Sequence, residues 1–276
     1  MDLKTLIDTP PWDWPEDAEK ILQKILNDSR AEESDRLVAA ELAGDSTVIN
    51  DDLVDALMAI ICHADESEKL RARAAISLGP VLEQADTDGF EDPDGVPISE
   101  RTFRNIHVTL HRVYLDNSNP KEVRRRILEA SVRAPKEWHQ NVVMEAYSSG
   151  DKDWKLTAVF SMRWVQGFDN QILEALRSAD PEILYQAVNA AGNWELDAAW
   201  PRIVELLNDA GTPKPLLLAA IAAASSIRPR EAREILIDLV ASDDEEIAEA
   251  ADEAIAISEP ASDEEDDEDG ASEWIN

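Results

Sequence analysis

The sequence predicts an all-α fold, an α-solenoid of about seven stacked helical hairpins. Three observations support this prediction. A helical unit rich in small residues returns about every thirty residues, helices with larger apolar residues alternate with it, and no segment shows the two-residue alternation of a strand. A single hairpin of such an array cannot bury its own apolar face, so neighbouring hairpins must cover one another.

The repeating unit is clearest at residues 70–79, which read LRARAAISLG. Its alanines would allow this helix to approach its neighbours closely. The anchor position of the unit recurs at Ala39, Ala74, Ile127, Ala158, Ala187, Ala220 and Ala250. The steps between successive anchors are 35, 53, 31, 29, 33 and 30 residues, so the second step contains an insertion.

The helices that alternate with this unit carry larger apolar side chains. Leu53, Leu57 and Ile60 follow the spacing of one buried helix face, and residues 172–176, 203–207 and 235–240 repeat the pattern. A longer helix is expected from about residue 99 to residue 115, directly after the insertion. The alternation favours antiparallel helix pairs.

The turns carry signals for the start and the end of helices. Asp180 and Asn119 each stand before a proline, as a capping residue stands before a proline at the first helical position. Asp244 is a weaker version of the same signal. Three glycines that follow small-residue helices are interpreted as helix-ending residues, namely Gly44, Gly79 and Gly192.

Composition shifts divide the chain into five segments. Residues 1–15 are expected to form a cap in which Trp12 and Trp14 plug the end of the first hairpin, or a proline-rich ligand for another domain, and residues 9–17 are too rich in proline for a helix. Residues 16–85 would form repeats 1–2, residues 86–98 an acidic loop, and residues 99–258 repeats 3–7. Residues 259–276 are expected to be a disordered acidic tail.

The charge balance restricts the classes of partner. With 59 acidic and 26 basic residues, the chain has a net charge of −33, which makes it a poor general binder of nucleic acid or anionic membranes. Its one cysteine, Cys62, stands in an apolar run and is expected to be buried. No signal peptide is recognisable and no apolar stretch approaches the roughly 18 residues of a membrane span, so we expect a cytoplasmic protein.

The repeating unit resembles the HEAT repeat, especially the short bacterial HEAT-like repeats first named in phycobilisome lyases. Residues 65–79 keep the acidic turn and the Val/Leu-Arg-x-x-Ala-Ala-x-x-Leu-Gly run of that family, and residues 120–132 keep its Val-Arg opening. The copies at residues 154–159 and 215–224 are degenerate. The resemblance covers about residues 16–257 and implies a right-handed solenoid of HEAT-like hairpins. It implies no single activity, because the repeat occurs in scaffolds, adaptors, lyases and a few nucleic-acid enzymes.

A basic island between residues 101 and 136 is the principal candidate for partner binding. Nine basic side chains face three acidic ones there, and the nine are Arg101, Arg104, Arg112, Lys121, Arg124, Arg125, Arg126, Arg133 and Lys136. The three consecutive arginines must point in different directions on a helix, so one of them should be a structural residue near a groove between helices. The island is interpreted either as an ion-paired face or as an acceptor for an acidic partner, a phosphate or the tail of the chain.

The tail has the composition of a ligand for this island. Seven consecutive acidic residues, 263–269, precede Trp274 and Ile275, which could add an apolar anchor. A short tether would give the tail a high effective concentration, so docking within the chain or on a neighbouring chain is a second hypothesis. A chain ending at Glu259 should then bind polyanions more tightly.

Five tryptophans recur through the central and C-terminal repeats, and they are Trp138, Trp154, Trp164, Trp194 and Trp200. They are interpreted either as residues that fill gaps between hairpins or as the lining of a groove for a partner peptide. Trp154 and Trp194 join the arginines Arg101, Arg104, Arg112, Arg124, Arg125, Arg126 and Arg133 as candidate partner-binding residues.

The sequence predicts no catalytic residue, metal or cofactor. His107 and His111 are four residues apart on one predicted helix, but arginines surround them and oppose a cation. We expect a non-catalytic scaffold or adaptor that binds another protein through the solenoid groove. The alternatives are a ligand-holding, lyase- or chaperone-like helper resembling phycobilin lyases, and an acidic DNA mimic that sequesters basic proteins. The acidic surface disfavours a DNA glycosylase of the HEAT-like type, because those enzymes bind DNA through a basic surface.

Overall fold

A computed structural model describes residues 3–92 and 95–257 of the chain. Within these residues the regular structure is entirely helical and no strand occurs, which confirms the predicted all-α class. The chain divides into two compact units, residues 1–175 and residues 176–276. Each unit is an array of stacked helical hairpins.

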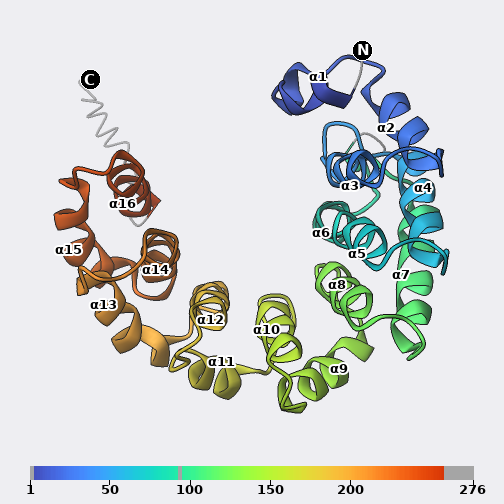
Figure 1. The fold of residues 1–276 in the computed structure, drawn as a ribbon. Coiled ribbons are helices and arrows are strands. Elements are labelled where there is room, and N and C mark those ends of the chain that lie inside the picture. The colour runs from blue at the N-terminus through green and yellow to red at the C-terminus, as the bar shows by residue number, and fades with distance from the viewer. Residues whose placement is uncertain (1–2, 93–94, 258–276) are drawn as a thin grey trace, which may run out of the picture. The chain divides into compact units, whose positions relative to one another are not determined.

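The first unit contains four hairpins, which are α2/α3, α4/α5, α7/α8 and α9/α10 (Figure 1). The second helices stack in sequence, α3 on α5, α5 on α8 and α8 on α10, and the first helices α2, α4 and α7 do the same. The elements are α1 (Leu3–Ile7), the 3₁₀ helix η1 (Pro11–Asp13), α2 (Ala18–Asn27), α3 (Glu33–Leu42), α4 (Asp51–Cys62), α5 (Glu68–Ile76), α6 (Gly79–Asp88), α7 (Glu100–Leu115), α8 (Lys121–Ser131), α9 (Glu137–Ser148), α10 (Lys152–Ser161) and α11 (Asp169–Ala175).

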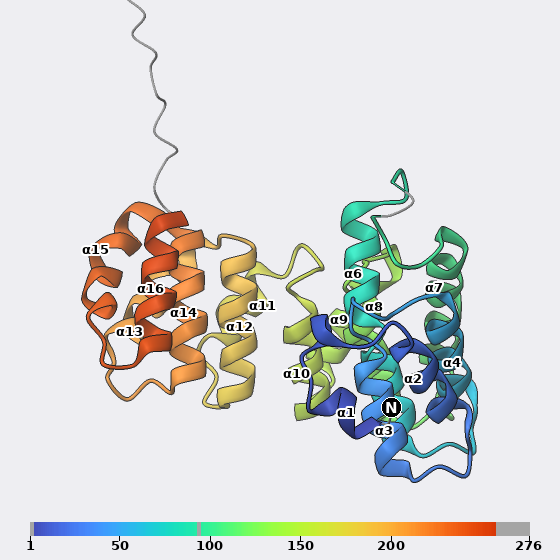
Figure 2. The same cartoon turned by 90° about the horizontal axis from the view of Figure 1, so that it is seen from above.

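The second unit repeats this arrangement. The helices α12, α14 and α16 lie side by side (Figure 2), and α13/α14 and α15/α16 form hairpins. The elements are α12 (Pro181–Asn193), the 3₁₀ helix η2 (Asp197–Ala199), α13 (Trp200–Asn208), α14 (Lys214–Ile227), α15 (Pro229–Val240) and α16 (Glu245–Ile257).

The predicted repeat positions agree with the helices. The helices α3, α5, α8, α10, α12, α14 and α16 begin at residues 33, 68, 121, 152, 181, 214 and 245, so their steps are 35, 53, 31, 29, 33 and 31 residues. The anchor positions at Ala39, Ala74, Ile127, Ala158, Ala187 and Ala220 are all 0% exposed. Small buried side chains at this position allow successive second helices to pack closely.

The insertion after the second repeat is partly helical. Residues 79–88 form α6, which packs on α8, and the acidic loop that follows leads to Ser99. The Ser99 side chain accepts a hydrogen bond from the backbone N–H of Thr102 at 3.2 Å, and α7 then ends at Leu115. The predicted helix from about residue 99 to residue 115 is therefore confirmed.

Two of the three predicted helix caps are confirmed. Asp180 accepts from the backbone N–H of Glu182 at 3.0 Å, and Asp244 accepts from that of Glu246 at 3.2 Å. The prediction for Asn119 is wrong. Its side chain instead donates to the backbone carbonyl of Val113 at 2.9 Å, and the residue before α8 is a proline with no side-chain cap.

The prediction that these glycines follow the ends of helices holds for Gly44 and Gly79, which come shortly after α3 and α5, and is wrong for Gly192, which lies inside α12. Among described glycines, the ones with positive φ are residues 89, 150 and 167. A Cβ on Gly192, inside α12, would lie 2.8 Å from the Cα of Ala223, and one on Gly44 would meet Ser77 of the next repeat. These glycines therefore permit close approach between successive repeats, which is a packing requirement.

Three further expectations are corrected. Residues 11–13 form a 3₁₀ helix despite the prolines, because Pro11 occupies a first position where no N–H is required. Trp12 is 78% exposed and therefore does not plug the first hairpin, whereas Trp14 donates to the backbone carbonyls of residues 6 and 9. Cys62, at the end of α4, is exposed.

Two further expectations concern the C-terminal tail and membrane-spanning helices. The predicted tail, residues 259–276, lies outside the described residues. Among the helices that are described, none is both long and apolar enough to cross a lipid bilayer.

Candidate interaction surface

The three consecutive arginines of α8 have different environments, as their helical positions require. Arg125 is 6% exposed and lies in the interface between α8 and α10. Its Nε donates to the hydroxyl of Thr157 at 2.9 Å, and its Nη1 pairs with Glu122 at 2.8 Å. The Thr157 hydroxyl donates to Glu129 Oε1 at 2.6 Å. Arg125 is therefore the structural arginine that the sequence led us to expect.

Glu129 connects this buried network to the next arginine. Glu129 is 4% exposed, and its other oxygen accepts from Arg126 Nη1 at 2.6 Å. Arg126 also donates from Nε to Glu122 at 2.8 Å. Arg125 therefore joins α8 to α10, whereas Arg126 pairs with two acids of its own helix.

Arg124 hydrogen-bonds to the C-terminal end of α7, the first helix of its own hairpin. Its Nε donates to the backbone carbonyl of Tyr114 at 2.8 Å. The guanidinium carbon lies 5.2 Å from the centre of the Tyr114 ring and 5.7 Å from the centre of the Trp154 ring. Trp154 is half-buried and meets Tyr114 edge to face at 6.3 Å, so it fills a gap between hairpins.

The sequence reasoning missed two arginines that share the position of Arg124. Arg36 and Arg71 each donate to the backbone carbonyl ten residues earlier, those of Leu26 and Ile61, at 3.0 Å. Arg36 also pairs with Glu66 at 2.7 Å, in the turn before the next second helix. The signal was present in the sequence, because residues 36, 71 and 124 are separated by the repeat steps of 35 and 53.

The arginines of α7 are the exposed part of the island. Arg104 is paired with Glu100 one helical turn earlier, and Arg112 Nη2 lies 3.6 Å from Cys62 Sγ. Arg101 is exposed and has no ion pair with the residues that the structure describes. Surface charges of this kind contribute little to stability, so Arg101 remains the least constrained of the candidates.

The two lysines of the island pair with acids from other repeats. Lys121 Nζ lies 2.7 Å from Asp151 and 2.8 Å from Asp153, and these hydrogen bonds hold the pKa of both carboxyl groups below its usual range. Lys136 Nζ lies 3.4 Å from Asp86. Much of the positive charge counted along the sequence is therefore balanced by acids that lie outside that stretch.

Arg133 stands at the centre of a cluster of charged and aromatic side chains. Its Nη1 pairs with Glu83 at 2.9 Å, and the same carboxylate accepts from Trp164 Nε1 at 3.2 Å. The guanidinium carbon of Arg133 lies 5.1 Å from the centre of the Trp164 ring and 5.8 Å from that of Phe160. The two rings are 4.9 Å apart and both are half-buried.

A cavity of about 390 Å³ adjoins this cluster. Arg133 belongs to both, and the other lining residues are Pro11, Trp14, Glu41, Leu42, Gly44, Asp45, Ile76, Ser77 and Pro80. They come from the N-terminal segment, from the ends of α3, α5 and α8, and from the beginning of α6. We call the cavity and the Arg133 cluster together the Arg133 surface, which extends over four successive hairpins.

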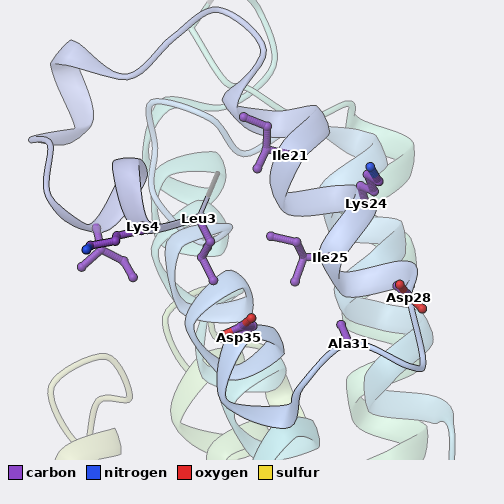
Figure 3. Close-up of a pocket in the computed structure, with 9 residues that line it drawn as sticks. Leu3, Lys4, Ile21, Lys24, Ile25, Asp28, Ala31 and Asp35 are labelled. Atoms are coloured by element: carbon purple, nitrogen blue, oxygen red, sulfur yellow. The ribbon is translucent and has the colours of Figure 1, made fainter. Parts of the chain in front are cut away.

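A second hollow, of about 530 Å³, lies between α1, α2 and α3. Figure 3 shows Leu3, Ile21 and Ile25 directed toward it, with Lys24 and Asp28 at its edge. It faces the start of the array. Its lining contains no aromatic side chain among the described residues, so it lacks the pairing of a charged group with an aromatic ring that is found at the Arg133 surface.

Trp194 lies in the second unit, at the end of α12. Its backbone N–H donates to the carbonyl of Ala190 at 3.2 Å, and its side chain is half-buried. The next residue, Glu195, has a φ of 48°, the one positive value among described non-glycine residues. Trp194 therefore belongs to a different unit from the candidate arginines.

Two histidines of the first unit, His107 and His139, are largely removed from solvent and are neutral near pH 7. Burial lowers the pKa of His107 to about 4 and that of His139 to about 3. His139 Nδ1 accepts from the backbone N–H of Lys136 at 2.8 Å, which leaves Nε2 to donate to Ser131 Oγ at 3.0 Å. In the described part of the chain, no three histidine, cysteine or acidic side chains gather as metal ligands.

Comparison with solved structures finds distant likenesses. Human deoxyhypusine hydroxylase in complex with glycerol is 14% identical with a TM-score of 0.41, over 93% of this chain and 88% of that chain. An engineered protein is 16% identical with a TM-score of 0.45, over 93% and 70%. A designed armadillo repeat protein is 14% identical with a TM-score of 0.34, over 86% and 98%. No family model and no curated protein matches the sequence.

Proposed function

We propose that this protein is a non-catalytic scaffold or adaptor of HEAT-like repeats that binds a segment of another protein on the Arg133 surface. The proposal is carried by one observation, the Arg133, Glu83, Trp164 and Phe160 cluster beside a cavity of about 390 Å³. Tryptophan and arginine are the residues in which binding energy is most often concentrated at protein interfaces.

The contacts of the cluster suit burial by a partner. The indole N–H of Trp164 already donates to Glu83, so a partner could cover the exposed part of the ring without leaving a donor unsatisfied. Arg133 is held between the same carboxylate and two rings. A preorganised anchor loses little side-chain freedom on binding, which favours affinity.

The same contacts favour a role in binding over a role in catalysis. Each charged group of the cluster is engaged by another member, and the cluster offers no nucleophile beside a base. The cavity lining combines apolar residues with a few polar ones, Glu41, Asp45, Ser77 and Arg133, which suits recognition of a side chain.

The test is a quantitative capture experiment with the full-length protein. Wild type, Trp164→Ala and the control Trp12→Ala are immobilised and exposed to lysate of the native host. Trp12 is a matched control because its ring is 78% exposed and lies outside the cavity lining. We expect a specific protein that wild type and the control capture equally and that Trp164→Ala captures at least about tenfold less.

The purified partner then gives the affinity. Loss of a central tryptophan should weaken binding by about 2 kcal/mol, roughly 30-fold. Equal capture by all three proteins would refute the Arg133 surface. A small molecule that stays bound to the purified protein would favour the ligand-holding alternative, and salt-sensitive capture of several unrelated basic proteins would favour the DNA mimic.

A further inference from the structure

The helix α15, which is the first helix of the α15/α16 hairpin, carries an exposed stripe that changes from basic to apolar along its length. Arg230, Arg233, Ile237 and Val240 are three, four and three residues apart, so they share one helix face. Ile237 is 61% exposed and Val240 is 37% exposed, and both arginines are exposed. Adjacent apolar side chains on a helix are normally buried in an array of this kind.

The position of α15 explains why this face is open. In the first unit, two first helices are covered by the first helix of the following hairpin, α2 by α4 and α4 by α7. Within the described residues no hairpin follows α15/α16. The terminal hairpin of a repeat array requires some other cover for its apolar side chains.

The residues beyond the described part have the complementary order. Seven consecutive acidic residues, 263–269, come first, and Trp274 and Ile275 come after them. Because α16 returns along α15 as the second helix of a hairpin, the chain leaves α16 beside the beginning of α15. A segment that turns back along α15 would meet the arginines first and the apolar residues second.

The lengths are compatible with this path. Arg233 and Val240 are separated by about 10 Å along the helix axis, at about 1.5 Å per residue. The segment from Asp266 to Trp274, nine residues joined by eight steps, can span up to about 27 Å when extended. The acidic run therefore reaches the arginines while Trp274 and Ile275 reach Ile237 and Val240, with length to spare.

We propose that residues 263–276 dock on the α15 stripe and cap the array. The acidic run pairs with Arg230 and Arg233 and lies near the beginning of α15, where the helix dipole favours negative charge. Trp274 and Ile275 cover Ile237 and Val240. Asp238, next to Ile237, repels the acidic run from the apolar end and so favours this order of contacts. The basic island of the first unit is then not the receptor of the tail.

Disulfide trapping in the full-length chain tests the proposal. Cys62→Ser removes the one natural thiol, and Asn276→Cys places a thiol next to the apolar anchor. The test position is Ala241→Cys, directly after α15, and the control is Ala210→Cys, which follows α13. Both alanines are exposed and follow the end of a first helix, and the long tether can reach either.

Docking predicts that, with the same mild oxidant, residues 241 and 276 form a disulfide at least tenfold faster than residues 210 and 276. Trp274→Ala should reduce this ratio, and Arg230→Glu together with Arg233→Glu should reduce it further, whereas Arg177→Glu should leave it unchanged. Equal rates for the two pairs in the parent background would overturn the proposal. A ratio insensitive to both Trp274→Ala and the arginine changes would overturn it as well.

Discussion

Replacement of Glu129 by glutamine should destabilise the first unit strongly although the side chains have the same shape. Glu129 is 4% exposed, and the loss of its charge leaves Arg125, which is 6% exposed, with Glu122 as its remaining acid. Removing one partner of a buried ion pair costs about 3–5 kcal/mol. Because Glu122 continues to pair with Arg125, we expect a loss of about 3 kcal/mol, at the lower limit of that range.

The assay is urea unfolding followed by far-UV circular dichroism, with hydrogen exchange of the α8 and α10 peptides as a local measure. The matched control is Glu100→Gln, which removes an exposed pair whose side chains are 68% and 55% exposed. That change should cost less than about 1 kcal/mol. Similar stability losses for Glu129→Gln and Glu100→Gln would refute the reasoning that burial makes this network important.

A triple variant separates the net contribution of the network to stability from the destabilisation caused by removing only one partner. Arg125→Leu, Glu129→Leu and Thr157→Val replace the three buried polar side chains of this network with apolar ones. Buried ion pairs replaced completely by apolar side chains are often as stable as the original. The triple variant should therefore be more stable than Glu129→Gln. A lower stability would show that the polar network stabilises the fold more than the apolar side chains that replace it.

Three further changes test the contacts between repeats by the same unfolding measurement. Gly192→Ala should cost about 1–3 kcal/mol, because the new Cβ would lie 2.8 Å from a backbone atom of α14, while Gly95→Ala, with no contact closer than 3.4 Å, should be nearly neutral. Arg71→Met should cost about 2 kcal/mol by leaving a buried carbonyl unsatisfied, and the exposed Arg73→Met should cost less than about 1 kcal/mol. Asp151→Ala should cost about 1 kcal/mol through loss of the cap on α10, and hydrogen exchange of the first turn should increase.

The sequence predicted the repeat register well because the signal is local. Alanine at the anchor position and an acid or proline in the turn are properties of single hairpins, and six of the seven anchors lie fully buried where expected. Gly192 was misinterpreted as a helix-ending residue because the reason for a glycine at this position is not local. Gly192 is required by Ala223, 31 residues away, and no local rule distinguishes a close approach from a helix end.

The candidate surface was predicted less well for a related reason. The basic island was counted along the chain, but Glu83 and Asp151, which pair with Arg133 and Lys121, come from other repeats. Repeat proteins place residues about thirty positions apart in direct contact, so charge must be counted across neighbouring repeats. Trp164 was recognised only as one of several tryptophans, because its contact with Glu83 spans 81 residues.

The two units differ in their content of buried histidines, so lowering the pH should destabilise them to different extents. The buried histidines His107 and His139 lie in the first unit, where burial lowers their pKa to about 4 and about 3. In the unfolded chain a histidine has a pKa of about 6.5, so the unfolded state binds protons first as the pH falls. Their contribution to the free energy of unfolding is therefore complete above about pH 6.5 and is lost at up to about 1.4 kcal/mol per pH unit for each histidine as the pH falls toward 4.

The second unit has no such group. Of its shifted carboxyl groups, Asp197 is exposed and Asp244 is half-buried. Hydrogen bonds from Arg228 and Lys214 lower the pKa of these carboxyl groups below 3.8, so they protonate only at lower pH. Between pH 6.5 and pH 5, hydrogen exchange should accelerate in α7, α8 and α9 and remain nearly constant in α12, α14 and α16 after correction for the chemical rate. His107→Gln should reduce the acceleration in α7. Equal acceleration in both units would show that general charge repulsion, rather than buried imidazole, governs the response to acid.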